Sequence, residues 1–384
     1  MSHDKFQNTK VPLYIFSVSL FLSLSSFSLL MNDHGIEELT FLPVIGECDD
    51  CVNIHGIRSM SKGNPPPLDG WKLLEKDGSI DIVHYSQTTG ERKIDPVGFY
   101  HSENNLALFY NSSPGGNYDD WAGHPHATTQ DGSLISFSEN LMFNKNYEVN
   151  PVFNEPQYNW QGKNRTNPYA LVWHEDHQTF YTFYGDFAEK GDNDKYPGRR
   201  ALGVAKSKNL IDWEYLSVDE PLFHIRDMEK FAPEVFESVD DVTRQGRVYA
   251  FGAIYHDGFI YLNVGGSTNR ELNFNFIVRS QDPLEGWELV MTDAPRPMPI
   301  EYDGKWYSLY NLQADGNPDG RAIGLEVADC MTCEYERKGQ LFDIQHWTSA
   351  GHSRQLFMYK GRWHVAFRVG DEGNNRSLRI AVAE

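Results

Sequence analysis

The sequence has few cysteines and little positive charge, and it contains only one long apolar run. It has 4 Cys, and 34 Lys and Arg stand against 54 Asp and Glu, which gives a formal net charge of −20. This charge argues against nucleic acid as a partner, because binding it relies on basic side chains that neutralise phosphates. No glycine-rich phosphate loop connects a strand to a helix, so no nucleotide-binding motif is present.

The single apolar run covers residues 11–31 and follows Lys5 and Lys10. A charged stretch ahead of an apolar segment is typical of a secretory signal. The run also has roughly the 20 residues that cross a bilayer, so an uncleaved membrane anchor is the alternative. We therefore expect residues 1–31 to be a signal peptide or an anchor. The protein would then be secreted, or would contact a membrane only through this segment.

The four cysteines form two CxxC pairs, Cys48 with Cys51 and Cys330 with Cys333. In an exported protein this spacing favours disulfides, which close each pair locally or tie the N-terminal extension to the body. A tetrahedral zinc site is the alternative, although the wide gap between the pairs argues against it. Acceptor sequences for N-glycosylation occur at Asn111, Asn164 and Asn375.

Residues 32–75 have the composition of a linker, with the Pro- and Gly-rich segment 63–70 as its clearest punctuation. From residue 76 onward, short runs of aromatic and β-branched residues alternate with Gly, Asp and Asn turns, and no amphipathic helix of appreciable length appears. A unit of roughly 60 residues recurs five times, which predicts an all-β, five-bladed β-propeller over residues 76–384. A β-sandwich is the competing fold, but the self-similarity of the units favours the propeller. Five tryptophans at repeat-like positions are interpreted as packing between blades: Trp160, Trp213, Trp287, Trp306 and Trp363.

The first strand of each blade lines the channel of a propeller, so residues at the starts of these strands converge at one channel mouth. The residues at these positions are Asp95, Asn167, Ala232, Asp293 and His352. Cleavage of a sugar acetal needs a pair of carboxyls, one as nucleophile or base and one as proton donor. An Asp at a strand start can instead serve turn chemistry, by bonding its own backbone. Two such Asp at matching positions, together with a His, favour a functional site.

At these residues the chain resembles the furanosidase-type five-bladed propellers, which are glycoside hydrolase families 32 and 43 and relatives such as family 117. The resemblance covers most of residues 90–384. The segment that begins IDPVGFY resembles the opening of family 32. It implies that Asp95 is the nucleophile or base, and that Trp121 and His124 lie at the substrate rim.

Two further segments resemble these families. The segment DAPRPMPI resembles the one that carries the general acid, which implies this role for Asp293 and places Arg296 among the substrate-binding residues. The segment SAGHSRQLF resembles the last blade of family 43, whose Gly-His faces the channel near a calcium ion or its water. This resemblance points to His352 as a substrate-binding residue and to a structural calcium near it, with no other cofactor required.

The third acidic residue of these families is replaced by Ala232. Glu234 follows two positions later on what would be the same strand face, and it is the candidate third acid. Asp227, after Arg226, is a second candidate. Asp293 stands where the families have Glu, and a shift of about 1 Å in a reacting group can cost on the order of 100-fold in rate.

The sequence therefore predicts a glycosidase that acts on an oligo- or polysaccharide. The scissile bond would be a furanoside, such as a fructoside or arabinoside, or a related anhydrosugar linkage. Asp95, Asp293 and Glu234 would be catalytic, and Asn167 would contact the substrate. The alternative, raised by Ala232 and Asp293, is a catalytically inactive propeller that binds carbohydrate.

Overall fold

The computed structural model describes the greater part of the chain beyond residue 63. The described ranges are 64–74, 93–102, 105–113, 126–129, 138–139, 160, 167–187, 200–208, 213–239, 246–268, 272–313, 321–343, 354–359, 361–370 and 376–384. The predicted signal or anchor lies outside them, as do Cys48 and Cys51. Within these ranges, no helix is both long and apolar enough to cross a bilayer.

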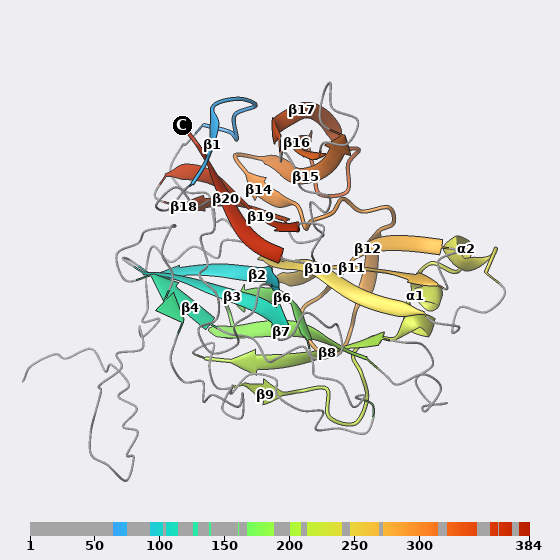
Figure 1. Cartoon of the computed structure of the whole chain (residues 1–384). Coiled ribbons are helices and arrows are strands. Elements are labelled where there is room, and N and C mark those ends of the chain that lie inside the picture. The colour runs from blue at the N-terminus through green and yellow to red at the C-terminus, as the bar shows by residue number, and fades with distance from the viewer. Residues whose placement is uncertain are drawn as a thin grey trace, which may run out of the picture. The chain divides into compact units, whose positions relative to one another are not determined.

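The described strands form antiparallel hairpins in chain order (Figure 1). They group into five four-stranded units, which we call blades I to V. Blade I contains β2 (Lys93–Ser102), β3 (Asn105–Ser113), β4 (His126–Thr129) and β5 (Ser138–Glu139). Blade II contains β6 (Asn167–His174), β7 (Thr179–Phe187), β8 (Arg200–Ser207) and β9 (Glu214–Tyr215).

Blades III to V repeat this pattern. Blade III contains β10 (Arg247–His256), β11 (Phe259–Thr268), β12 (Leu272–Ser280) and β13 (Glu288–Met291). Blade IV contains β14 (Ile300–Tyr302), β15 (Lys305–Gln313), β16 (Arg321–Ala328) and β17 (Glu336–Asp343). Blade V contains β18 (Arg354–Tyr359), β19 (Arg362–Gly370) and β20 (Arg376–Ala383). The predicted number of four-stranded units is confirmed.

The fourth strand of blade V comes from the N-terminal side of the chain. β1 (Trp71–Leu73) pairs antiparallel with the end of β20, with Trp71 opposite Ala383. The Trp71 indole nitrogen donates a hydrogen bond to the carbonyl of Pro67 at 2.8 Å, and its ring lies 6.0 Å from that of Phe342. β1 lies inside the range 32–75 that the sequence assigned to a linker, so the boundary after residue 75 does not separate the linker from the sheet.

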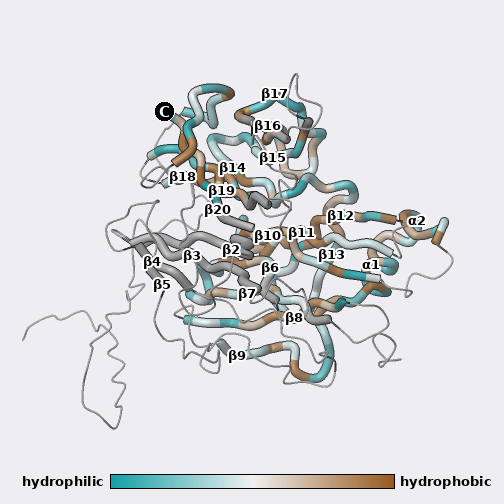
Figure 2. Tube along the Cα trace, viewed as in Figure 1, coloured by the Kyte–Doolittle hydropathy of each residue, from teal (hydrophilic) through white to brown (hydrophobic). Residues whose placement is uncertain are grey.

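Apolar side chains fill the spaces between neighbouring blades. Trp287, ahead of β13, packs edge-on against Phe183 of β7 at 5.8 Å, which joins blades III and II. Trp306 of β15 contacts His256 of β10. The sequence interpretation of these tryptophans as packing residues is therefore confirmed. Figure 2 shows hydrophobic residues along the strands of blade III, whereas β17 is largely hydrophilic.

The prediction for the start of blade III is wrong. The sequence placed a strand at Ala232, but this region forms two short helices, α1 (Ile225–Phe231) and α2 (Pro233–Phe236). A proline in the first turn is compatible with a helix, because its missing N–H would have no partner there. The innermost strand of blade III is instead β10, which begins at Arg247.

Cys330 and Cys333 form a disulfide within the connection between β16 and β17. The local pairing expected for this CxxC sequence is therefore confirmed. A zinc site that uses these two cysteines is not compatible with their being bonded to each other.

Replacing Trp71 by Ala should weaken the closure of blade V. We expect the free energy of unfolding to fall by roughly 1–3 kcal/mol, because a partly buried indole and its hydrogen bond are lost. Unfolding in urea measures this change. Leu68→Ala is the control, since Leu68 is 46% exposed. Equal losses in the two variants would show that the ring contributes nothing to closure.

The buried His364 should make the protein less stable in mild acid. Burial is the main cause that lowers the pKa of His364 from 6.5 to about 4. The neutral ring is therefore favoured by folding: its contribution is complete above pH 6.5 and is lost as the pH falls toward 4, by roughly 2–3 kcal/mol at pH 4.5. His364→Asn should reduce the fall in unfolding free energy between pH 7 and pH 4.5 by this amount. An unchanged fall would contradict the assignment.

Candidate active site

The innermost strands of blades I to III share an irregularity at the same position. In each strand one residue is left unpaired, and these residues are Val97 in β2, Tyr169 in β6 and Phe251 in β10. Each innermost strand pairs along its length on one side only, so a bulge or a proline costs little there. Bulges next to active sites often re-aim side chains.

Aligning the three bulges places Asp95, Asn167 and Tyr249 at equivalent positions, two residues before the unpaired one. Their cross-strand partners are Asn111, Gly185 and Gly265. β6 contacts both β2 and β10. The structure therefore places the predicted residues Asp95 and Asn167 on neighbouring strands at matching positions. The equivalent residue of blade III is Tyr249 rather than Ala232.

Glu234 does not lie on a strand. It is an exposed residue in the first turn of α2, where a negative charge is favoured by the helix dipole. The expectation that it shares a strand face at the channel is therefore wrong, because residues 225–236 are helical.

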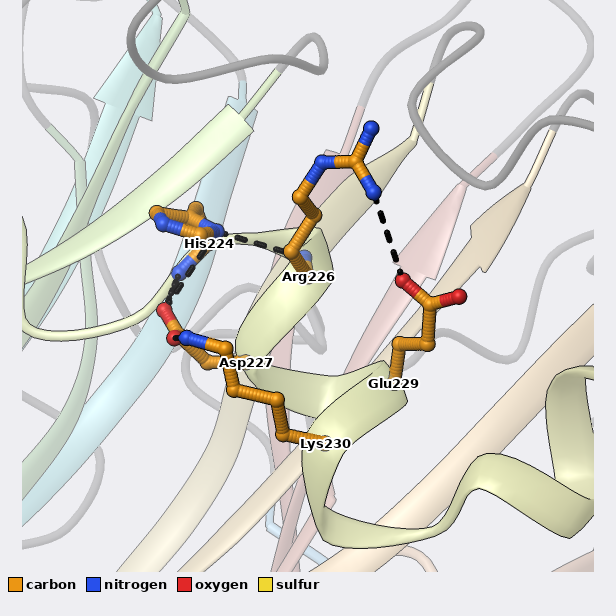
Figure 3. A network of polar contacts seen from close by, with 5 residues as sticks. All are labelled: His224, Arg226, Asp227, Glu229 and Lys230. Atoms are coloured by element: carbon orange, nitrogen blue, oxygen red, sulfur yellow. Dashed lines mark hydrogen bonds and ion pairs between the residues drawn. The ribbon is translucent and has the colours of Figure 1, made fainter.

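The other candidate, Asp227, caps α1 (Figure 3). Its Oδ2 accepts a hydrogen bond from the backbone N of His224 at 3.0 Å, and its Oδ1 lies 2.9 Å from Nζ of Lys230. The imidazole Nδ1 of His224 accepts a hydrogen bond from the backbone N of Arg226. Burial lowers the pKa of His224, and the nearby Asp227 carboxylate opposes this shift. These contacts give Asp227 a structural role at the start of the helix.

Asp293 lies on the connection between β13 and β14. It is exposed and adopts a left-handed backbone conformation with φ of 52°, which Asp tolerates better than most residues. The next residues are fixed to blade III: the side chain of Asn275 donates to the carbonyl of Ala294 at 2.6 Å, and that of Asn263 donates to Pro295 at 2.7 Å. Asp293 thus stands beside β12 of blade III.

Arg296 reaches the bulge of β10. Its guanidinium carbon lies 4.3 Å from the centre of the Phe251 ring, and Nη2 donates to the carbonyl of Phe274 at 2.8 Å. Burial lowers the pKa of Arg296. The neighbouring Arg354 is almost fully buried and donates to the carbonyl of Arg296. Burial lowers the pKa of Arg354 to about 10, and Glu326 opposes this shift.

Further aromatic and basic side chains surround this point, and sequence reasoning missed them. Arg200 Nη1 donates to the hydroxyl of Tyr169 at 2.6 Å, and its guanidinium lies 4.8 Å from the Tyr249 ring centre. Arg247 lies within 3.5 Å of the Tyr249 hydroxyl. We call the following residues the arginine–aromatic cluster: Tyr169, Arg200, Arg247, Tyr249, Phe251 and Arg296. One sequence signal was available, since β8 and β16 begin with Arg-Ala-Leu-Gly and Arg-Ala-Ile-Gly.

Three predicted site residues, Trp121, His124 and His352, lie outside the described residues. The calcium expected near His352 stays a prediction for the same reason. Within the described ranges, no group of three His, Cys, Asp or Glu residues could hold a metal ion.

No protein-family model and no curated protein sequence match the chain. Solved structures do match it. One is a complex of BT0996 with RGII, with a TM-score of 0.53 and 13% identity over 79% of this protein and 90% of that one. A structure described as a glycoside hydrolase gives the same values. The catalytic domain of a GH62 α-L-arabinofuranosidase from Coprinopsis cinerea matches with a TM-score of 0.50 and 10% identity, over 81% of this protein and 96% of that domain.

At these identities the likeness concerns the fold. The chain has the fold of the five-bladed β-propeller glycoside hydrolases, as its sequence predicted.

Gly265→Ala should be more destabilising than Gly185→Ala. A Cβ at Gly265 would lie 2.6 Å from Asn275 Oδ1 and 2.8 Å from the Phe274 carbonyl oxygen, as well as 2.4 Å from the Phe251 ring. We expect a loss of roughly 1–3 kcal/mol from overpacking. A Cβ at Gly185 would meet only the Tyr169 ring, at 2.2 Å, and this ring can turn away. Urea unfolding of both variants measures the difference, and equal losses would contradict this interpretation of the two sites.

Proposed function

We propose that the protein is a glycoside hydrolase whose active site lies where the innermost strands of blades I to III begin. The observation that carries this proposal is the position of Asp95. It occupies the same register as Asn167 and Tyr249, ahead of a bulge that the three strands share. A carboxylate where the repeat elsewhere has an amide or a phenol marks the one blade of the three that can supply a nucleophile or base.

The proposed reaction uses two carboxyls. Asp95 would attack the anomeric carbon, or would activate a water that does so, while a second carboxyl protonates the departing sugar oxygen. Asp293 is the proposed proton donor. A carboxyl separation of about 5 Å would give retention of configuration, and roughly 6.5–9.5 Å would give inversion.

The proposed substrate is an oligo- or polysaccharide with a furanoside or related anhydrosugar linkage. The fold supports this choice, because one structure that shares it is an α-L-arabinofuranosidase. The cluster also supports it, because aromatic rings such as Tyr249 and Phe251 can stack on the apolar face of a sugar. Both residues are only partly buried.

A catalytically inactive carbohydrate-binding propeller is the second candidate. Glu234 lies on α2, and the backbone after Asp293 is fixed to β11 and β12. Among the described residues, neither of these carboxyls is on an innermost strand. A protein with Asp95 as its sole carboxyl at the site would bind sugar without cleaving it.

Asp95→Asn should abolish hydrolysis while preserving binding. We expect turnover to fall by about 100- to 10,000-fold, because the amide can neither attack nor accept a proton. Fructan, sucrose, arabinan, xylan and red-algal galactan oligosaccharides form the substrate panel, and released reducing sugar is measured. Asp293→Asn should lose activity by a similar factor if Asp293 is the acid.

Asp303→Asn is the matched control. It makes the same charge change in the exposed β14–β15 turn, where the φ of 51° at Asp303 suits Asn as well as Asp. Wild-type activity in Asp95→Asn would overturn the proposed role of Asp95. Calorimetric binding of one panel member without turnover in the wild type would establish the carbohydrate-binding alternative.

A further inference from the structure

Basic residues recur where the proposed active site lies. Lys93 of β2 and Arg247 of β10 occupy equivalent positions, two residues before Asp95 and Tyr249. Each forms a parallel pair with an arginine that begins the third strand of another blade, Lys93 with Arg376 and Arg247 with Arg200. The third strand of blade IV also begins with an arginine, Arg321. In a chain with a net charge of −20, the overall composition does not account for this concentration of positive charge.

In blades II and III the side chains of these arginines join the arginine–aromatic cluster. Arg200 and Arg247 both contact Tyr249, because one stacks on its ring and the other approaches its hydroxyl. The Tyr249 ring stacks with Phe251 at 6.2 Å, and Arg296 lies over Phe251. The six members are partly exposed, so a ligand can reach them.

Two of these arginines form no ion pair with a carboxylate among the described residues. The polar partner of the Arg247 side chain is the phenol of Tyr249, and that of Arg296 is the carbonyl of Phe274. Arginines elsewhere in the described ranges have acidic partners: Arg279 pairs with Glu288, and Arg226 with Glu229. A partly buried guanidinium without a counter-ion favours binding of an anion.

We propose that the arginine–aromatic cluster binds an anionic group of the saccharide, either a uronate carboxylate or a sulfate ester. Both anions present oxygens that a guanidinium fork can bind in pairs, and the aromatic rings hold the forks in place. The protein would thus select acidic oligosaccharides over neutral ones. This inference rests on the proposed function, because it assigns the substrate class of the same site.

Calorimetric titration of the full-length protein tests the proposal. The probes are an oligogalacturonide, a sulfated galactan oligosaccharide and a neutral arabinan oligosaccharide of equal length. We expect one acidic probe to bind at least tenfold more tightly than the neutral one, and its affinity to fall as salt is added. The acidic probe that binds identifies the anion as carboxylate or sulfate.

Arg247→Gln and Arg296→Gln should each weaken binding of that acidic probe by about 10- to 100-fold, the value of a hydrogen bond to a charged group. The neutral probe should be unaffected. Arg226→Gln removes an exposed arginine on α1 and is the matched control, with no change expected. Arg247→Lys and Arg296→Lys keep the charge without the fork and should give intermediate losses. They replace a Gln variant whose melting temperature shows that it is not folded.

The outcomes separate this inference from the proposed function. Equal binding of acidic and neutral probes, or acidic binding that the arginine variants leave unchanged, would overturn the inference. Hydrolysis of a neutral oligosaccharide would then still support the glycosidase. If no saccharide is bound or hydrolysed, both the inference and the proposed function are wrong.

Discussion

The innermost strand of each blade pairs along its length with one neighbour only, and the rest of the site depends on this constraint. A strand with a single partner tolerates the prolines at 96 and 168 and the bulges that follow, because no second ladder is interrupted. The bulges in turn fix which residues of blades I to III share a position. Asp95, Asn167 and Tyr249 are brought into register by backbone geometry, although they are far apart in sequence.

Most of the blade pattern was predictable from the sequence, because strands with alternating apolar residues and Gly or Asp turns have a strong local signal. The start of blade III was not. Ala232-Pro233-Glu234 has the composition of a strand start, but Pro233 opens a helix, and α1 before it is capped by His224 and Asp227. His is not among the usual N-cap residues, so the capping box was not recognised. The predicted third acid was lost with this strand.

The candidate site was predictable only in part, for a related reason. Asp95 and Asn167 were found because Asp-Pro and Asn-Pro mark the strand start directly. The arginine–aromatic cluster depends on cross-strand register, which a one-residue shift changes completely. Arg200 and Arg247, for example, meet through a single parallel pair between β8 and β10. Their partners at Tyr169 and Phe251 are the bulged residues, and their positions follow from pairing that the sequence does not state.

An acidic sugar beside a catalytic carboxylate imposes an electrostatic condition that the cluster can meet. Two like charges about 8 Å apart repel by about 2 kcal/mol at an effective dielectric constant of about 20. A guanidinium at a similar distance from both offsets this repulsion, and it also favours the ionised form of a carboxyl, which a nucleophile or base requires. Arg247 and Tyr249 lie on the same strand, and Arg200 is paired to it. The anion-binding groups are therefore held by the same strand register that sets the position of Asp95, so substrate selection and catalysis would depend on one backbone feature.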